Sequence, residues 1–370
     1  MAELTPDATH PERLRVLIAG GGTGGHVIPA LAIAHELVAQ YNAEVRFIGT
    51  ARGMETRLVP AAGFPLDLVQ VGQLNSVSFG TRVRTVARLP VGLLTCMRLL
   101  RNFRPHAVLG VGGYASGPAM LAAILTGIPR VAFEPNAVPG MANRWIGRRV
   151  QAAAVNFAAT ARYFHNATVT GIPVRPEFFS LAPREPDASP HLLVFGGSQG
   201  ARMLNTAMPQ IVAPLLQAIP RLTILHQCGA KHLESTQLAY EQSGASSACW
   251  RVREFLDDMP QQIGAASLVL CRSGASTVAE LAAAARPSLL VPFPQAADDH
   301  QRHNAEMLVQ AKAAEMLLQA NLTPKNLLDR LTALLGSPER LAAMGRQART
   351  LAHPDAALQI ARMLKKLQPA

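Results

Sequence analysis

Seven consecutive residues near the beginning of the chain read Gly20-Gly21-Gly22-Thr23-Gly24-Gly25-His26. An apolar run precedes them at residues 16–19, and apolar residues at helical spacing follow over residues 27–37. This order predicts a β-strand, a glycine-rich turn and an α-helix. Glycines let backbone amides approach an anion closely, and the start of a helix offers unpaired N–H groups. The stretch therefore predicts a phosphate-binding loop, in which Thr23 supplies a hydroxyl and His26 a titratable group.

The same stretch matches a second pattern. Gly20, Gly22 and Gly25 satisfy the GxGxxG spacing of dinucleotide-binding folds. That function needs an acidic residue at the end of the next strand to bind the ribose. The next predicted strand covers residues 44–48, and its only acid, Glu44, stands at its start. We therefore expect a phosphate-bearing ligand other than a nicotinamide or flavin cofactor.

The composition is that of a large globular protein with an anionic partner. The chain has 370 residues, of which 49% are hydrophobic and 16% charged, so two domains with sizeable cores are expected. The formal net charge of +11 indicates a phosphorylated substrate, an anionic lipid or a nucleic acid. Nucleic acid is the least supported, because aromatic residues make up only 5% and none is interleaved with a basic run.

Cysteine spacing and the first residues bear on metal and compartment. The four cysteines are scattered without a CxxC pair, so we expect no structural zinc site. Low cysteine use fits a reducing cytosol. The polar stretch of residues 1–12 lacks the apolar core of a signal peptide.

Short apolar runs alternate with longer helical ones along the chain, which predicts an α/β protein with parallel sheets. We expect strands at residues 14–19, 44–48, 107–110, 130–133, 152–155, 191–195, 222–227, 250–254, 268–271 and 288–291. Helices are expected at residues 29–40, 82–102, 115–126 and 141–148. A linker-like segment at residues 182–190 separates two halves, each of which begins with a strand and a glycine turn. We predict domains at residues 1–181 and 182–345, with a helical segment over residues 346–370 that packs back across both.

A further motif follows the strand expected at residues 268–271. It reads Arg272-Ser273-Gly274-Ala275-Ser276-Thr277-Val278-Ala279-Glu280. Serine and glycine at the start of a helix offer hydroxyl and N–H donors to an anion. Glu280 lies two turns into that helix, where a carboxylate can accept bonds from both hydroxyls of a ribose. Together with the glycine loop at residues 196–198, the motif favours a nucleotide site over an ordinary capped helix.

Five motifs in this order resemble the MurG glycosyltransferase family: GGGTGGH at 20–26, GGYASGP at 112–118, GGSQGAR at 196–202, RSGASTVAE at 272–280 and DDHQ at 298–301. The resemblance runs from about residue 15 to residue 362. It implies the GT-B fold, in which two Rossmann-like domains face each other across a cleft. Two segments depart from the family pattern, because HEQN reads FEPN at residues 133–136 and GNPVR reads GIPVR at residues 171–175.

The resemblance implies a binding site for UDP-N-acetylglucosamine on the second half of the chain. Ser198 would bind the diphosphate, the Leu256 backbone the uracil, and Glu280 the ribose. Gln301 would contact the N-acetylglucosamine, and Asn136 and Arg175 would complete the donor site. Thr23, Gly24 and Gly25 would approach the sugar and the acceptor phosphates. The full substrate-binding set comprises Thr23, Gly24, Gly25, Asn136, Arg175, Ser198, Leu256, Ala275, Ser276, Thr277, Val278, Ala279, Glu280 and Gln301.

The reaction implied is inverting transfer of N-acetylglucosamine to the C4 hydroxyl of the muramoyl sugar of lipid I, which forms lipid II for peptidoglycan synthesis. A single displacement needs a base at the hydroxyl and charge stabilisation at the diphosphate. His26 is the candidate base, since a neutral imidazole can take the proton near pH 7; binding a phosphate is its alternative role. The chain has no DxD triplet, so we expect neither a metal ion nor a cofactor.

A basic segment without acids covers residues 68–133. Its arginines alternate with apolar residues over 82–104, a pattern that suits the surface of an anionic bilayer. The candidate membrane contacts are Arg82, Arg84, Arg88, Leu93, Leu94, Arg98 and Arg101. A buried helix with exposed arginines is the alternative. The membrane interpretation places the protein peripherally on the cytoplasmic face of the inner membrane.

Two other functions remain open from the sequence. The same fold could act on another lipid acceptor, such as diacylglycerol. The chain could also be a nucleotide-binding module without transfer chemistry.

Overall fold

The structure is a computed structural model that describes residues 13–51, 53–70, 79–182, 184, 189–197 and 199–369, with the backbone alone over residues 79–89. Contacts divide the chain into two compact units. Unit 1 comprises Met1–Glu134, Pro139–Thr170 and Asp355–Ala370, and unit 2 comprises Pro135–Val138 and Gly171–Pro354. The units therefore change over after Thr170, earlier than the expected boundary after residue 181. The sequence alone also does not predict that residues 135–138 belong to unit 2 while the residues on either side of them belong to unit 1.

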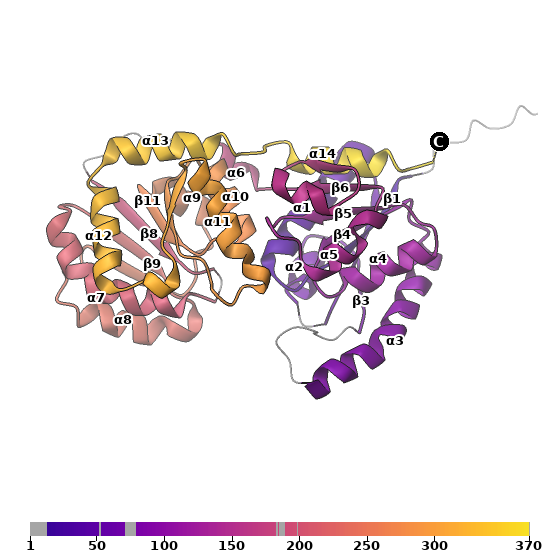
Figure 1. Ribbon diagram of the computed structural model, residues 1–370, viewed down its shortest axis with the longest axis horizontal. Helices are drawn as coiled ribbons and strands as arrows, with labels where there is room; N and C mark the ends of the chain where they lie inside the picture. Colours follow the sequence, from indigo (N-terminus) through magenta and orange to yellow (C-terminus); the bar gives the residue numbers. More distant parts are fainter. Residues whose placement is uncertain are drawn as a thin grey trace, which may run out of the picture. The chain divides into compact units, whose positions relative to one another are not determined.

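Unit 1 is built on a parallel sheet of seven strands (Figure 1). The strand order is β3-β2-β1-β4-β5-β6-β7, so the direction of winding reverses between β1 and β4. The strands are β1 (Arg15–Gly20), β2 (Glu44–Gly49), β3 (Leu66–Leu68), β4 (Ala107–Gly112), β5 (Arg130–Glu134), β6 (Ala152–Val155) and β7 (Ala167–Val169). The helices are α1 (Gly24–Tyr41), α2 (Glu55–Ala61), α3 (Phe79–Phe103), α4 (Ser116–Leu125), α5 (Met141–Ile146) and α14 (Ala356–Lys365), with short helices η1 (Gly147–Arg149) and η2 (Ala158–Tyr163).

Unit 2 repeats this design with six parallel strands in the order β10-β9-β8-β11-β12-β13. The strands are β8 (His191–Phe195), β9 (Thr223–Gln227), β10 (Trp250–Arg253), β11 (Leu268–Cys271), β12 (Ser288–Leu290) and β13 (Ala314–Met316). The helices are α6 (Pro176–Phe179), α7 (Arg202–Ala218), α8 (Leu233–Glu241), α9 (Met259–Ala265), α10 (Ala275–Ala283), α11 (His300–Gln310), α12 (Pro324–Leu335) and α13 (Pro338–Arg349), with η3 (Ala230–His232), η4 (Ala297–Asp299) and η5 (Gln319–Asn321). Figure 1 shows α7 and α8 on one side of this sheet and α10 and α11 on the other. That arrangement follows from right-handed crossovers wound in both directions from β8 and β11.

Continuous apolar strands buried on both faces produce these sheets. In unit 1, Val16, Leu17, Ile18 and Ala19 of β1 are fully buried, and in unit 2 Leu192, Leu193 and Val194 of β8 are fully buried. All the strands expected from the sequence are present, and β6, β8 and β11 have the expected bounds. Three edge strands were missed, β3, β7 and β13. Each is three residues long and has a polar or charged residue at its centre, so none has a clear apolar run.

The last part of the chain is helical and belongs in part to unit 1, but it is not one continuous helix. It forms two helices, α13 in unit 2 and α14 in unit 1, separated by residues 350–355. Pro354 lies in this break, and a proline disfavours helical conformation in the residue before it. Helix α14 packs against α1. The face that it buries carries Ala356, Ile360, Ala361 and Leu364. That the two units face each other across a cleft stays a prediction.

Candidate functional site

The predicted loops lie where each sheet changes its direction of winding. In unit 1, β1 ends at Gly20 and its neighbour β4 ends at Gly112. In unit 2, β8 ends at Phe195 beside Cys271 of β11. Doubly wound sheets bind ligands outside the carboxyl ends of their strands at this point. The four glycine- and serine-rich motifs at residues 20–26, 112–118, 196–202 and 272–280 therefore form one candidate site in each unit.

Close backbone packing explains part of the glycine content of unit 1. A Cβ atom added to Gly20 would overlap the carbonyl oxygen of Gly112, and one added to Gly113 would overlap that of Gly21. The loops after β1 and β4 thus lie backbone against backbone. Gly22 differs, because an added Cβ would meet nothing within 4 Å, and its φ of +92° is the reason for glycine there.

Helix α1 begins directly after this loop. Thr23 is its N-cap residue, and the Thr23 side chain makes no capping hydrogen bond. The Thr23 hydroxyl lies 3.4 Å from Nδ1 of His26. The other side of the His26 ring packs on β4, where a Cβ added to Gly112 would lie 3.0 Å from Nε2. The structure therefore brings Thr23, Gly24, Gly25 and His26 together at a helix start that can bind an anion.

Sequence reasoning missed Glu55, the first residue of α2. Its carboxylate accepts hydrogen bonds from the amide of Gly22 at 2.7 Å and from the amide and hydroxyl of Thr50 at 2.9 Å each. The acidic residue that follows β2, Glu55, therefore binds the backbone of the glycine loop and not a ribose. Its position soon after the second strand was the signal available in the sequence.

In unit 2, α10 supplies a second open helix start. Gly274 is its N-cap residue and, being glycine, supplies no side chain to cap the helix. Ala275, Ser276 and Thr277 form the first turn, with Val278, Ala279 and Glu280 following on the same helix. Arg272 points elsewhere, because its guanidinium donates to the carbonyl oxygens of Val291 and Pro292 at 3.0 Å each. Arg272 therefore binds the backbone that follows β12, and it precedes the first residue of α10.

Glu280 and Arg175 are neighbours, as the predicted donor site requires. Burial raises the pKa of the Glu280 carboxyl to about 7, and the positive charge of Arg175 works in the opposite direction. The Arg175 guanidinium also lies over the ring of Phe178, 5.1 Å from its centre. Both residues belong to unit 2, although the sequence had placed Arg175 in the first domain.

A buried amide, Asn304, links three predicted site elements. Its Nδ2 donates to Oδ1 of Asn136 at 3.3 Å and to the carbonyl oxygen of Ser273 at 3.2 Å. Its Oδ1 accepts from the amide of Ala137 at 2.9 Å, and the side chain is 0% exposed. Asn136 is thereby joined to unit 2, where residues 135–138 belong. Asn304 was missed, although it stands one helical turn after Gln301.

Gln301 lies at the start of α11, after two successive aspartates with left-handed backbone, Asp298 and Asp299. Its Oε1 accepts from the amide of Phe293 at 3.0 Å, and its carbonyl oxygen accepts from the Ser273 hydroxyl at 2.7 Å. The side-chain oxygen is therefore used internally. The Nε2 group is the part of this side chain that remains to donate to a ligand.

The second glycine loop contacts the ends of β9 and β10. A Cβ added to Gly200 would overlap the carbonyl oxygen of Cys228, so the loop touches the end of β9. Past the end of β10, the carbonyl oxygen of Glu254 accepts from Nε2 of Gln227 at 2.9 Å and from the amide of Gly229 at 3.2 Å. Leu256 follows and is buried. Ser198 lies outside the described residues.

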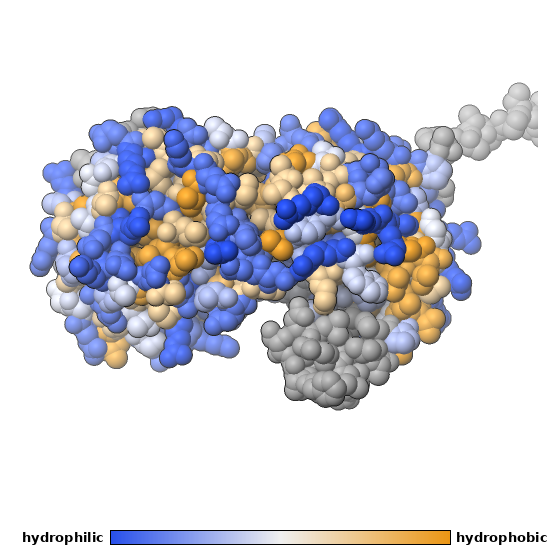
Figure 2. All heavy atoms as spheres, viewed as in Figure 1, coloured by the Kyte–Doolittle hydropathy of each residue, from blue (hydrophilic) through white to orange (hydrophobic). Residues whose placement is uncertain are grey.

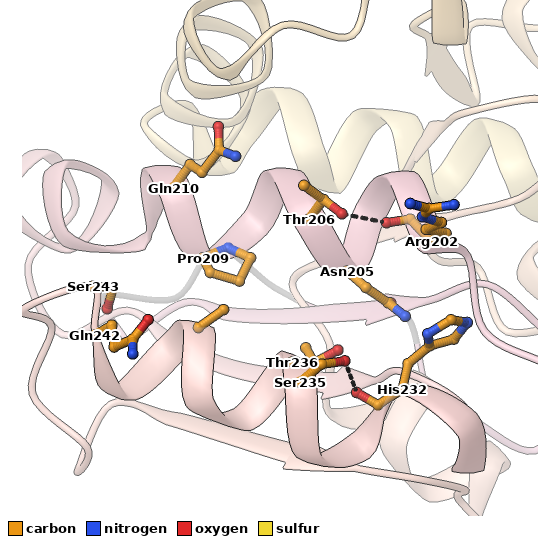
Figure 3. A pocket seen from close by; sticks show the side chains of 11 residues that line it. Arg202, Asn205, Thr206, Pro209, Gln210, His232, Ser235, Thr236, Gln242 and Ser243 are labelled. Atoms are coloured by element: carbon orange, nitrogen blue, oxygen red, sulfur yellow. Dashed lines mark hydrogen bonds between the residues drawn. The ribbon is translucent and has the colours of Figure 1, made fainter.

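A groove of about 420 Å³ lies between α7 and α8 (Figure 3). In Figure 3, Arg202, Asn205 and His232 stand at one end, and Gln242 and Ser243 at the other. Arg202, the last residue of the second glycine motif, lines it, but none of the predicted substrate-binding residues does. The groove therefore begins at the edge of the candidate site of unit 2.

Two features of the described residues bear on metals and membranes. Within residues 13–369, apart from the gaps given above, no group of three or more His, Cys, Asp or Glu side chains could hold a metal ion. In the same part of the chain, no helix has both the length and the apolar character needed to cross a membrane.

Comparison with known proteins gives the family. Residues 16–155 match the glycosyltransferase family 28 N-terminal domain, and residues 191–360 match the family 28 C-terminal domain. A protein of Solibacter usitatus is 44% identical over 353 residues, which are 95% of each chain. It is named UDP-N-acetylglucosamine–N-acetylmuramyl-(pentapeptide) pyrophosphoryl-undecaprenol N-acetylglucosamine transferase. A protein of Stutzerimonas stutzeri with the same name is 44% identical over 343 residues, or 92% of this chain and 95% of that protein.

A solved structure agrees. The crystal structure of Acinetobacter baumannii MurG superposes with a TM-score of 0.76 and 32% identity, and covers 95% of this chain and 99% of that one. The chain belongs to the MurG family. The GT-B fold and the glycosyltransferase class expected from its motifs are thereby confirmed.

Proposed function

We propose that this chain transfers N-acetylglucosamine from UDP-N-acetylglucosamine to the C4 hydroxyl of the muramoyl sugar of lipid I, which gives lipid II for peptidoglycan synthesis. The observation that carries the proposal is the 44% identity, over 95% of both chains, to a relative named for this transfer. The local geometry is compatible with it, because each unit offers an open helix start at the carboxyl edge of a parallel sheet.

Unit 2 is the proposed donor site. The amides at the start of α10, together with Ser198, bind the diphosphate, and Glu280 accepts hydrogen bonds from the ribose hydroxyls. The backbone of Leu256 binds the uracil. Gln301 donates from Nε2 to a hydroxyl of N-acetylglucosamine, since its Oε1 is bound to the amide of Phe293. Asn136 and Arg175 complete the site. Asn304 holds Asn136 by a hydrogen bond, and Arg175 lies beside Glu280.

Unit 1 is the proposed acceptor side. Thr23, Gly24 and Gly25 bind phosphate oxygens at the start of α1, and His26 takes the proton of the attacking hydroxyl. In the reaction, an electron pair of the C4 oxygen forms a bond to C1 of N-acetylglucosamine while the bond from C1 to the diphosphate breaks. UDP leaves with that electron pair. Its new negative charge is stabilised by the start of α10 and by Arg175.

We propose that unit 1 also contacts an anionic membrane surface, peripherally and on the cytoplasmic face of the inner membrane. Leu94 of α3 and Leu125 of α4 are 65% and 60% exposed, and the two helices are in contact. Figure 2 shows apolar residues gathered at this side of unit 1. Arg98 and Arg101 are exposed on the same helix, α3, whereas Leu93 is partly buried. The side chains of Arg82, Arg84 and Arg88 lie outside what the structure describes.

An acceptor comparison tests the function. The purified chain is given UDP-N-acetylglucosamine labelled in the sugar and either a lipid I analogue or diacylglycerol. The proposal requires label in the lipid I product and a rate with diacylglycerol that is at least about 100-fold lower, because a site built for one polar acceptor rejects another strongly. Equal or faster transfer to diacylglycerol would contradict it.

A further inference from the structure

Glu55 lies beneath the glycine loop of unit 1 and ties it to a second loop. The side chain is 1% exposed. Oε2 accepts from the amide of Gly22 at 2.7 Å, and Oε1 accepts from the amide and the hydroxyl of Thr50 at 2.9 Å each. In addition, the amide of Met54 donates to the carbonyl oxygen of Gly22 at 3.3 Å. Both polar groups of the Gly22 backbone are thus held by the start of α2.

Three glycines surround the Glu55 side chain at close distance. A Cβ atom added to Gly21, Gly49 or Gly53 would overlap the Glu55 side chain. These glycines come from three different loops or strand ends. The close approach of Glu55 is therefore one reason for glycine at these three positions, and at Gly21 the φ of +153° is a second.

The carboxylate is ionised at neutral pH. Burial raises its pKa, but hydrogen bonds from the amides of Gly22, Thr50 and Glu55 itself, and from the Thr50 hydroxyl, lower it by more. The pKa therefore lies below the usual value for a glutamate. A fixed negative charge under the loop weakens the attraction of an anion, so phosphate affinity is not what this group contributes. Charge-assisted bonds to backbone amides, by contrast, are strong and hold geometry.

The bond to Gly22 also decides which amides can face an anion. The Gly22 amide points to Glu55, and the amides of His26 and Val27 both donate to the carbonyl oxygen of Thr23, at 3.1 and 3.2 Å. The part of the loop that can face a ligand therefore begins after Gly22. Its first residues are Thr23 and Gly24, at the N-terminus of α1.

We propose that Glu55 is a positioning residue for the transfer reaction: by fixing Gly22 it sets where α1 begins and hence where Thr23, Gly24 and His26 meet the acceptor. This inference rests on the proposed function. It assigns to Glu55 no contact with either substrate. It predicts that removing the charge changes the rate of the reacting complex and leaves donor binding in unit 2 unchanged.

The test is Glu55→Gln, which keeps the size of the side chain. The substitution introduces an Nε2 group, which is a hydrogen-bond donor. In the variant this donor must face one of the backbone N–H groups that donate to the carboxylate in the wild-type protein. We expect kcat with both substrates saturating to fall about 10- to 100-fold, as small displacements of reacting groups do. The dissociation constant of UDP-N-acetylglucosamine stays within about twofold of wild type, because unit 2 is untouched. Glu44→Gln makes the same chemical change at an exposed position of β2 and keeps the wild-type kcat.

The assays are run well below the melting temperature of each variant, so that a loss of stability alone leaves kcat per folded molecule unchanged. Thr50→Val removes the hydroxyl that holds Oε1 and so loosens the carboxylate that binds the Gly22 amide, and its kcat lies between wild type and Glu55→Gln. If Glu55→Gln does not fold, Thr50→Val decides. A kcat within about twofold of wild type in the variant that decides would overturn the inference.

A wild-type enzyme that transfers no sugar would contradict the proposed function and not the positioning role. In that case hydrogen exchange at the Gly22 amide is measured directly. The positioning role requires exchange at Gly22 that is about tenfold or more faster in Glu55→Gln than in Glu44→Gln, because a buried hydrogen bond protects an amide until it opens. Equal exchange in the two variants would overturn it.

Discussion

Glu280 lies beside Arg175 in unit 2. Burial raises the pKa of the Glu280 carboxyl to about 7, although the positive charge of the Arg175 guanidinium acts to lower it. The proposed ribose contact needs the ionised form, because a carboxylate accepts hydrogen bonds from both hydroxyls. The protonation state of Glu280 therefore changes within the physiological range of pH. Two predictions follow from this one residue.

The first concerns donor affinity. As the pH falls from 8 to 6, Glu280 takes up a proton and the dissociation constant of UDP-N-acetylglucosamine rises by about tenfold, since one pKa unit is worth about 1.4 kcal/mol. Calorimetry with the sugar nucleotide measures this, and a diphosphate diester does not itself titrate in that range. Glu280→Gln removes the pH dependence. An affinity of the wild-type protein that stays constant between pH 6 and pH 8 would refute the ribose contact.

The second concerns stability. The pKa of Glu280 is raised on folding, so the folded state favours the protonated form and loses stability as the pH rises from about 4.5 to about 7. Glu280→Gln removes this loss. We expect the variant to be more stable than wild type at pH 8, by at most about 3 kcal/mol, and similar to wild type at pH 5. Thermal unfolding of the variant and the wild type at the two pH values provides the measurement. An equal difference in stability between them at both pH values would show that folding does not raise the pKa of Glu280.

His26 is tested by separating turnover from binding. His26→Ala removes the candidate base and should lower kcat by about 100- to 10,000-fold, the usual contribution of general base catalysis. The affinity for UDP-N-acetylglucosamine should change little, because the proposed donor site belongs to unit 2. If donor affinity collapses while bound donor still turns over, His26 is a binding residue.

Asn304 should couple the segment of Asn136 to the donor site. Asn304→Ala leaves the Ala137 amide and the Ser273 carbonyl without their partner, and a buried unpaired group costs about 1–3 kcal/mol. We expect a loss of stability of that size and weaker donor binding. Asn136→Ala should cost less, because the bond to Ala137 survives. A double-mutant cycle with no interaction energy would mean that the 3.3 Å contact between the two amides contributes nothing.

Membrane binding is tested on α3. The pair Arg98→Glu and Arg101→Glu should reduce sedimentation with vesicles that contain anionic lipid, by about 1 kcal/mol for each arginine removed. Arg251→Glu changes one exposed charge in unit 2 and serves as the control. Binding of wild type that is insensitive to salt and to anionic lipid content would eliminate the membrane proposal.

The fold could be predicted from the sequence because its strands are uniformly apolar and its loops are marked by glycine. The apolar runs at β6, β8 and β11 predicted the bounds of these strands without error. The edge strands β3, β7 and β13 could not be found, because pairing with a neighbouring strand defines them and their own residues are mixed. The segment 135–138 was assigned to the wrong unit because its attachment depends on Asn304, which is far away in the chain.

The candidate site was predicted in part. The motif residues of each unit do gather at the carboxyl edge of its sheet, as Thr23 with His26 and Arg175 with Glu280 demonstrate. The supporting residues Glu55 and Asn304 were missed, because they act through backbone groups and carry no motif of their own. Phe133, which departs from the family pattern, is fully buried in β5.

Release of UDP measured with and without a lipid I analogue tests the central claim most directly. If the two glycine loops serve a donor in one unit and an acceptor in the other, UDP release is slow alone and rises by orders of magnitude with the acceptor, with one lipid II formed for each UDP. UDP release at the same rate without the acceptor, or binding of the donor with no release at all, would contradict the account.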